Sequence, residues 1–295
     1  MSNKIKVILD TDIGSDIDDA VALAYLLSQP RCDLLGVTTV SGQPLERCEM
    51  VSAICRTVDR DDVPIHAGCR EAILVDIRQK TAKQSAALGS WDRRRDFPEN
   101  TAIEFLRNTI RANPGEVTLL AIGPMTNVAL LLATDPDIAS QLKGLVLMCG
   151  QFFREMRGEW NAINDPHATA IAYSNGRHAR PPRHVSFGLD VTRRCTMTPQ
   201  ECRGRFNAKV LGPVKDFAEV WFSENPLLTF HDPLAAACIF EPDICTYKQG
   251  KVTVSLNEPT LGWTVFGERD ADKPHTVAHE VDSKRFFEHY FDVVK

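Results

Sequence analysis

The sequence has no excess of positive charge, no long apolar run and no regularly spaced cysteines. Its 34 Lys and Arg against 39 Asp and Glu give a net charge of −5, so nucleic acid and anionic membrane surfaces are poor partners. No stretch reaches the roughly 18 apolar residues of a membrane-spanning helix. The nine cysteines are odd in number and never spaced C-x-x-C, which argues against a zinc site. We expect them to be buried and reduced.

The chain also lacks the marks of a targeting segment or of several domains. The first residues hold one short apolar run that ends at Asp10, which is not the pattern of a signal peptide. We therefore expect a cytoplasmic protein. No repeat, low-complexity run or linker interrupts the 295 residues, of which 43% are hydrophobic. This composition is that of a globular protein, and we expect one catalytic domain over residues 1–295.

Short apolar runs alternate with longer amphipathic ones, which predicts an α/β fold. The predicted strands are residues 6–9, 34–40, 63–66, 117–122, 144–148 and 184–189, and the clearest helices are 20–27, 46–58 and 99–111. Continuous apolar strands that alternate with helices indicate a mostly parallel open sheet, a Rossmann-like core with helices on both faces. Residues 251–256 and 262–266 predict a small antiparallel addition at one edge, near the C-terminal end. Ligands of such folds bind beyond the carboxyl ends of the strands.

Five aspartates follow the first predicted strand within ten residues, in the segment DTDIGSDIDDA from Asp10 to Ala20. No basic residue lies between Lys6 and Arg31. Such crowding is destabilising unless a cation neutralises it, and an all-oxygen donor set suits Ca²⁺ or Mg²⁺. The spacing does not fit an EF-hand, because Val21 stands where that loop needs its glutamate. A single glycine also excludes the dinucleotide-binding fingerprint.

Three further segments join this loop in pointing to one family. They are AIGPMTN at 121–127, EWNAINDP at 159–166 and HDPLA at 231–235. Together with the aspartate loop they resemble, in order and over nearly the whole chain, the nucleoside hydrolases that are called inosine-uridine preferring. The family's loop reads D-x-D-x-G-x-D-D, and this chain has two extra residues between Gly14 and the pair Asp18-Asp19.

The resemblance implies metal-dependent hydrolysis of the N-glycosidic bond of ribonucleosides, which gives ribose and a free base. It implies one Ca²⁺ per chain, held by Asp12, Asp19, Asp232 and the main-chain carbonyl of Ile122. Asp12 would also act as the general base that activates the attacking water. Asp10 would orient the loop.

The resemblance assigns the remaining site residues to the substrate. Asp18, Glu159 and Asn161 would hold ribose hydroxyls, and the last two would point the same way if their segment is extended. His231 would assist departure of the base. A small ribonucleoside is thus the expected partner, and the enzyme is expected to be a homo-oligomer, a dimer or a tetramer.

Three departures from the family pattern leave questions open. The extra loop residues leave the roles of Asp16 and Asp18 open to exchange. The family's asparagine for the ribose 5′-hydroxyl has no counterpart in residues 149–158. Residues 78–98 could form a lid whose Trp91 stacks on the base, although a solvated basic loop is favoured.

Two other functions compete with this interpretation. ILDTD resembles the nucleophile loop of haloacid-dehalogenase-type phosphatases, but Gly14 and the lack of a late Gly-Asp-x-x-x-Asp segment disfavour it. A non-catalytic ribose- or nucleoside-binding module that keeps the metal is the other alternative. Release of reducing sugar from a nucleoside separates an enzyme from such a module.

Overall fold

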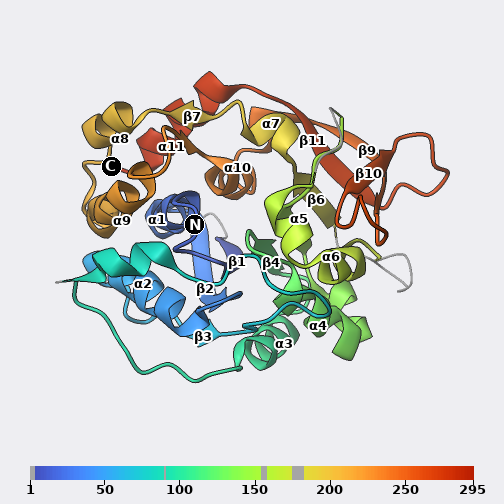
Figure 1. Ribbon diagram of the computed structural model, residues 1–295, viewed down its shortest axis with the longest axis horizontal. Helices are drawn as coiled ribbons and strands as arrows, with labels where there is room; N and C mark the ends of the chain where they lie inside the picture. The colour runs from blue at the N-terminus through green and yellow to red at the C-terminus, as the bar shows by residue number, and fades with distance from the viewer. Residues whose placement is uncertain (1–3, 90, 154–157, 175–182) are drawn as a thin grey trace.

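The computed structural model describes residues 4–89, 91–153, 158–174 and 183–295. Within these ranges nine strands form one sheet, in the order β10-β9-β11-β6-β5-β4-β1-β2-β3 (Figure 1). Their bounds are β1 (Ile5–Thr11), β2 (Cys32–Thr39), β3 (Ile65–Ala67), β4 (Val117–Ala121), β5 (Gly144–Met148), β6 (Arg183–Phe187), β9 (Cys245–Val254), β10 (Thr264–Gly267) and β11 (His275–Val281). Strands β7 (Thr196–Met197) and β8 (Leu228–Thr229) pair separately.

The direction of the strands confirms the predicted mostly parallel sheet. From β3 to β11 all neighbours in the sheet run parallel. At the edge, β9 and β10 pair antiparallel, as the sequence predicts. In this pair Thr264 lies opposite Val254. The sequence analysis missed β11, which lies between β6 and β9 and is parallel to the first and antiparallel to the second.

Helices cover both faces of this sheet (Figure 1). The α-helices are α1 (Asp18–Ser28), α2 (Pro44–Thr57), α3 (Ala102–Ala112), α4 (Thr126–Thr134), α5 (Trp160–Asn164), α6 (Pro166–Tyr173), α7 (Leu189–Thr192), α8 (Pro199–Arg205), α9 (Gly212–Phe222), α10 (His231–Ala237) and α11 (Ser283–Val293). Short 3₁₀ helices are η1 (Lys83–Leu88), η2 (Pro136–Gln141), η4 (Lys209–Leu211) and η5 (Pro242–Ile244). Every helix in the described ranges is too short or too polar to be a bilayer-spanning segment.

Two apolar cores explain why the central strands carry runs of consecutive apolar residues. Successive side chains of a strand point to opposite faces of the sheet. In β1, Val7 and Leu9 pack in the core formed by α1, α2, α10 and α11, whereas Ile8 packs in the core formed by α3, α4 and α6. Both faces are therefore covered, and side chains on both faces are mostly apolar. The nine cysteines are all free, and only Cys69 is not buried.

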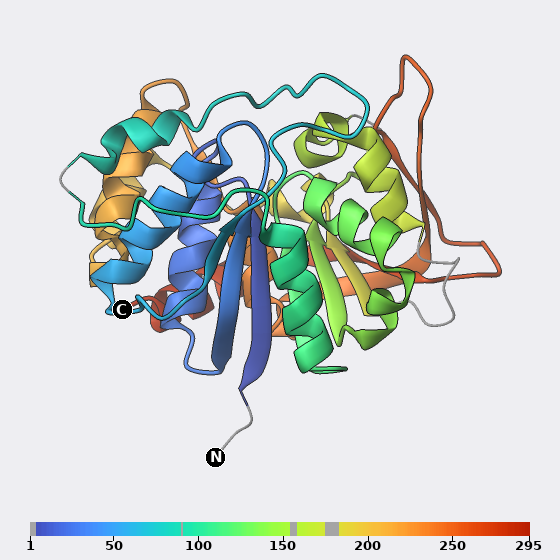
Figure 2. The same ribbon diagram turned by 90° about the horizontal axis from the view of Figure 1, so that it is seen from below.

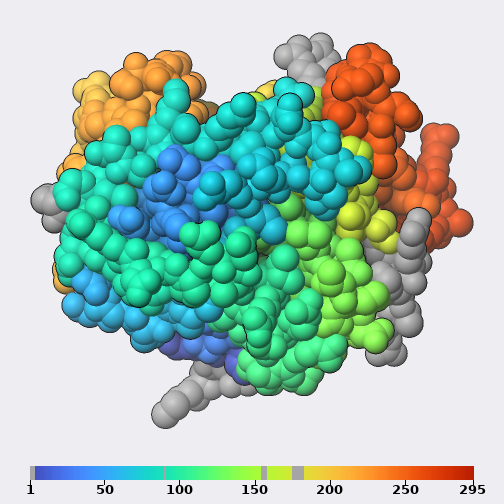
Figure 3. Space-filling view, turned by 60° about the horizontal axis from the view of Figure 1, so that its bottom comes forward, coloured from blue at the N-terminus to red at the C-terminus, as the bar shows by residue number. Residues whose placement is uncertain are grey.

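The carboxyl ends of the parallel strands meet at one edge of the sheet (Figure 2). The loop from β1 to α1 and the residues that follow β4, β5 and β6 all emerge at this edge. Helix α10 packs against α1 and so brings residues from late in the chain to the same place. The segment between β3 and α3 runs over the surface beside α2 (Figure 3).

Candidate active site

Asp10 ties the start of the aspartate loop to the sheet. It is fully buried in β1, and its Oδ1 accepts hydrogen bonds from Asn127 Nδ2 at 2.7 Å and Thr38 Oγ1 at 2.5 Å. Asn127 belongs to the AIGPMTN segment and also donates to the carbonyl of Thr39. Asp10 therefore connects β1 to β2 and α4 at the base of the loop.

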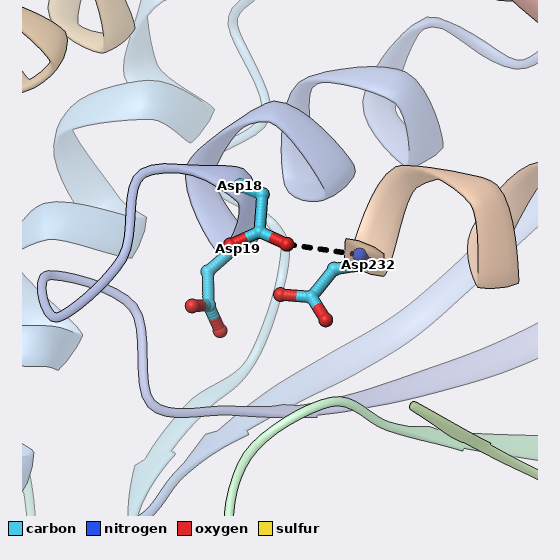
Figure 4. A group of neighbouring side chains, drawn as sticks. All are labelled: Asp18, Asp19 and Asp232. Atoms are coloured by element: carbon cyan, nitrogen blue, oxygen red, sulfur yellow. Dashed lines mark hydrogen bonds between the residues drawn. The ribbon is translucent and has the colours of Figure 1, made fainter. Parts of the chain in front are cut away.

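Three carboxylates from two distant parts of the chain converge above this point (Figure 4). Asp18 and Asp19 lie in the first turn of α1 and Asp232 in the first turn of α10. One oxygen from each lies within 4.8 Å of the other two, and all three side chains are buried. Asp18 Oδ2 accepts a hydrogen bond of 3.0 Å from the backbone N–H of Asp232. The packing of α1 on α10 thus brings Asp19 and Asp232, two of the predicted metal ligands, close together. It also places Asp18 in the same group.

A pocket of about 280 Å³ opens onto this group, close to the lower end of the range of about 300–1,000 Å³ for small-molecule sites. All eight sequence-predicted site residues line it, together with seven other residues. The lining residues are Asp12, Ser15, Asp16, Asp18, Asp19, Gln79, Ile122, Met148, Glu159, Trp160, Asn161, Leu189, Trp221, His231 and Asp232. Asp12 lies in this lining but outside the group of three carboxylates.

The segment that holds Glu159 and Asn161 is not extended, so the condition under which both side chains would point the same way is not met. Asn161 lies in the first turn of α5, and Glu159 is its N-cap. The Glu159 carboxylate accepts from the backbone N–H groups of Gly150, Asn161 and Ala162 at 2.7–3.0 Å. A capping carboxylate stabilises the helix by satisfying free N–H groups. Both side chains still line the pocket, but they come from a helix N-terminus.

Asn161 also contacts the carbonyl that the sequence analysis assigns to the metal. Its Nδ2 donates to Ile122 O at 2.7 Å and to Met148 O at 3.1 Å. The amide therefore joins the ends of β4 and β5. The same Ile122 carbonyl keeps a second lone pair.

His231 is half-buried at the start of α10. Its Nδ1 lies 2.7 Å from Thr192 Oγ1. Burial, with a smaller contribution from the charge of Arg193, lowers the pKa of His231 to about 4. The ring is therefore neutral near pH 7.

The sequence analysis gave no role to three aromatic and amide side chains that also line the pocket. Trp160 is 46% exposed and lies in the EWNAINDP segment, between the two residues assigned to ribose. Trp221 comes from α9, and Gln79 comes from the long segment after β3. No motif marked Trp221 or Gln79, because each reaches the pocket only through the packing of its segment.

Trp91 lies outside the pocket lining. Its Nε1 donates to Asp216 Oδ2 at 2.8 Å on α9, and its ring lies where a Cβ on Gly212 would be. The basic residues that follow Trp91 are engaged: Arg93 pairs with Glu49 and Arg94 lies over Phe97. The stacking role for Trp91 is not supported by this placement. Residues 154–157, within the stretch that departs from the family's 5′-hydroxyl pattern, are outside the described residues.

Burial and mutual repulsion make the acidic loop unfavourable without a counter-charge. Desolvation raises the pKa of Asp18, Asp19 and Asp232 well above the usual range, and the neighbouring aspartates raise it further. Burial likewise raises the pKa of Asp16 to about 7. A divalent cation would reverse this cost by favouring the ionised form.

The sequence and structure match known proteins over most of their length. The family model for inosine-uridine preferring nucleoside hydrolases matches residues 7–288. A uridine nucleosidase of Arabidopsis thaliana is 28% identical over 89% of this chain and 82% of its own. A pyrimidine-specific ribonucleoside hydrolase of Klebsiella pneumoniae is 29% identical over 96% of both chains.

A solved structure agrees with these sequence relatives. The purine-preferring ribonucleoside hydrolase of Gardnerella vaginalis superposes with a TM-score of 0.83 at 25% identity and covers 98% of both chains. Fold, motifs and family model thus point the same way, and a haloacid-dehalogenase-type phosphatase is excluded. The chain belongs to the inosine-uridine preferring nucleoside hydrolase family of enzymes.

Proposed function

We propose that the protein hydrolyses ribonucleosides with one Ca²⁺ bound at the carboxylate group, and that Asp12 and His231 divide the catalytic work. The observation that carries this proposal is the convergence of Asp18, Asp19 and Asp232 within 4.8 Å at the floor of the pocket. Asp232 lies 214 positions after Asp18 in the sequence, and a bound cation would offset the cost of burying three carboxylates together.

The donor set fits a hard divalent cation. Every candidate ligand is an oxygen: carboxylates of Asp12, Asp19 and Asp232 and the carbonyl of Ile122, all lining one pocket. Ca²⁺ accepts such mixed carboxylate and carbonyl sets in flexible geometry. When bound, the cation would supply positive charge that eases ionisation of the attacking water and attracts the ribose hydroxyls.

The protein's own groups would perform the remaining steps. Asp12 takes the proton from the water, since its carboxylate is buried and lines the pocket. Asp18 keeps the oxygen not bonded to the Asp232 amide for a ribose hydroxyl. Glu159 and Asn161 complete the ribose contacts. The ribosyl centre becomes positive in the transition state, so these carboxylates also stabilise it.

The base would leave beside the apolar lining residues Trp160, Trp221 and Leu189. The flat indole rings of the two tryptophans suit a purine or pyrimidine ring. The proposed role of His231 requires the neutral tautomer in which the Thr192 hydroxyl donates to Nδ1 and the proton stays on Nε2, where it can be donated to the departing base. Asp16 adds a carboxylate that the family's shorter loop lacks, at the same lining.

A nucleoside panel assayed for reducing sugar tests this function. Relatives are named for uridine or pyrimidines and a structural neighbour for purines, so the panel contains uridine, cytidine, inosine and guanosine. We expect release of ribose from at least one of them, abolished by chelator and restored by Ca²⁺. Binding of nucleosides without release would support the non-catalytic binding module instead.

We further propose that residues 1–295 form one catalytic domain and that the protein is a cytoplasmic dimer or tetramer. Analytical sedimentation measures the oligomeric state.

The stability of the metal-free protein is expected to fall as pH rises from about 4 to about 7 and to level off above that. The pKa values of Asp10 and Asp16 are about 7 in the folded protein against about 3.9 in an unfolded chain. The folded state therefore holds protons that the unfolded state has lost, and the free energy of unfolding declines as pH rises through 7. The proposed ligands Asp19 and Asp232 also have raised pKa values, so Ca²⁺ competes with protons for them and its stabilising effect grows with pH.

Melting scans of chelator-treated protein at several pH values, with and without added Ca²⁺, measure this dependence. Mg²⁺ serves as the control for ion identity. A rise in Tm on adding Ca²⁺ that is the same at pH 5.5 and pH 8 would contradict the prediction, and so would no rise at either.

A further inference from the structure

Four consecutive backbone carbonyls of the lengthened loop after β1, those of residues 12–15, accept hydrogen bonds from side-chain or backbone donors of other elements. Arg47 Nη1, from α2, donates to the carbonyls of Asp12 and Ile13, the latter at 2.8 Å. Gln84, from η1, donates through its backbone N–H to Gly14 O and through its side chain to Ser15 O, both at 3.2 Å. Buried carbonyls need such partners. Two residues from two different elements thus provide a donor for every carbonyl from position 12 to position 15.

Arg47 makes this contact from complete burial. Its side chain has no exposed surface. Besides the two loop carbonyls, Nε donates to Ser41 O at 2.9 Å and Nη1 to Ser15 Oγ at 2.9 Å, while Nη2 is buried with no hydrogen-bond partner in the described part of the chain. A buried guanidinium is costly unless it is paired. Its closest charge partners are Asp12 and Asp19, which oppose the lowering of its pKa by burial.

The loop has no room to shift between these two elements. Gly14 has φ of +105°, which favours glycine. A Cβ at this position would lie 2.7 Å from Met50 Sδ on α2 and 3.0 Å from Ala82 Cβ, just before η1. Gly14 is therefore enclosed from both sides by the elements that supply Arg47 and Gln84. Asp16, Asp18 and Asp19, which line the pocket, follow within five residues of Gly14.

We propose that Arg47 and Gln84 are positioning residues, which hold the lengthened loop by its carbonyls so that Asp12 and Asp16 face the pocket beside Asp18 and Asp19. The guanidinium fork acts through its geometry, because one planar group reaches the carbonyls of Asp12, Ile13 and Ser41 together. The inference rests on the proposed cation site, since it predicts how well the loop presents its carboxylates to a cation.

Arg47→Lys separates geometry from charge. The ammonium keeps the positive charge but cannot reach three carbonyls in a plane. We expect cation affinity and kcat each to fall about 10-fold, as for the loss of one to two hydrogen bonds to a charged group, with a smaller change in KM. Affinity is measured with Tb³⁺, a hard cation whose luminescence is excited through the pocket's tryptophans, and by displacement with Ca²⁺. All measurements are made well below the Tm of each variant.

Gln84→Met keeps the proposal testable if Arg47→Lys does not fold. Methionine has a similar length, and the backbone bond to Gly14 stays, so only the donor to Ser15 O is lost. We expect a loss of Tb³⁺ affinity of about 3- to 10-fold.

Arg93→Lys is the matched control. It makes the same substitution in an ion pair with Glu49 of α2, at 2.7 Å, without touching the loop. It should lower Tm while affinity and kcat stay at the wild-type values.

Unchanged affinity and kcat in both Arg47→Lys and Gln84→Met would overturn the proposal, whatever their Tm. An equal loss in Arg93→Lys would also overturn it, because the effect would then come from α2 as a whole. Failure of the wild-type protein to bind Tb³⁺ or to release ribose contradicts the proposed function itself, and the positioning role with it. Wild-type binding that only the two loop-holding variants weaken supports both.

Discussion

Asp12→Asn is expected to lower kcat for ribonucleoside hydrolysis by about 10²- to 10⁴-fold with little change in fold. The amide can still offer one oxygen to a cation, but it cannot take a proton from water. The loop should keep its shape, because its backbone is held at the Asp12 carbonyl by Arg47 and Ser15. Ribose binding should survive, since Asp18, Glu159 and Asn161 remain.

The comparison that makes this result specific is Asp16→Asn, the same substitution four residues along the same loop. Asp16 lines the pocket, and its Oδ1 accepts from the backbone N–H of Ile17 at 2.6 Å. Single-turnover rates and ribose affinity are measured for both variants, with a melting scan of each. If Asp12→Asn keeps more than about a tenth of the wild-type kcat, the general base is another residue. A large loss in Asp16→Asn alone would assign it to Asp16, and losses in neither would leave Asp10 as the next candidate.

His231→Ala is expected to slow inosine hydrolysis by about 10²-fold or more and to leave a p-nitrophenyl riboside nearly unaffected. Inosine loses a weakly acidic purine, which benefits from a hydrogen bond in the transition state. Nitrophenolate is a good leaving group and needs little help. Because the pKa of His231 is about 4, the ring is neutral throughout pH 6–8, so this contribution should not titrate in that range.

The ratio of the two rates, measured on wild type and variant, decides between leaving-group assistance and a structural role. If His231 only packs beside Asp232, both substrates should slow by the same factor, because water activation is common to both. Thr192→Val is the matched control, as it removes the hydroxyl 2.7 Å from Nδ1 while keeping the side chain's shape. It should affect inosine selectively and less strongly than His231→Ala. A change in the nitrophenyl riboside equal to that in inosine would exclude the proposed role.

The position of the aspartate loop could be predicted from sequence because it depends on local pattern. The largely apolar runs at 6–9 and 117–122 recur as β1 and β4, since a strand buried on both faces is apolar at most positions. Aspartates that follow such a strand must emerge at the carboxyl edge of a parallel sheet. The antiparallel pair of β9 and β10 could likewise be predicted, because two short apolar runs lie close together in the sequence.

What the sequence by itself determined was therefore the α/β class, the sheet's mixed edge, the family segments and which residues would gather at the site. Only the tertiary structure decided how they meet. Asp18 joined Asp19 and Asp232 because α1 packs on α10, Glu159 became a helix cap, and Trp221 reached the pocket from α9. The sequence analysis gave Arg47, within the predicted helix 46–58, no role, yet its side chain is fully buried and donates to the carbonyls of the loop. Periodicity reports which face of an element is buried, whereas the partner of a buried polar group is set by the packing of elements distant in sequence.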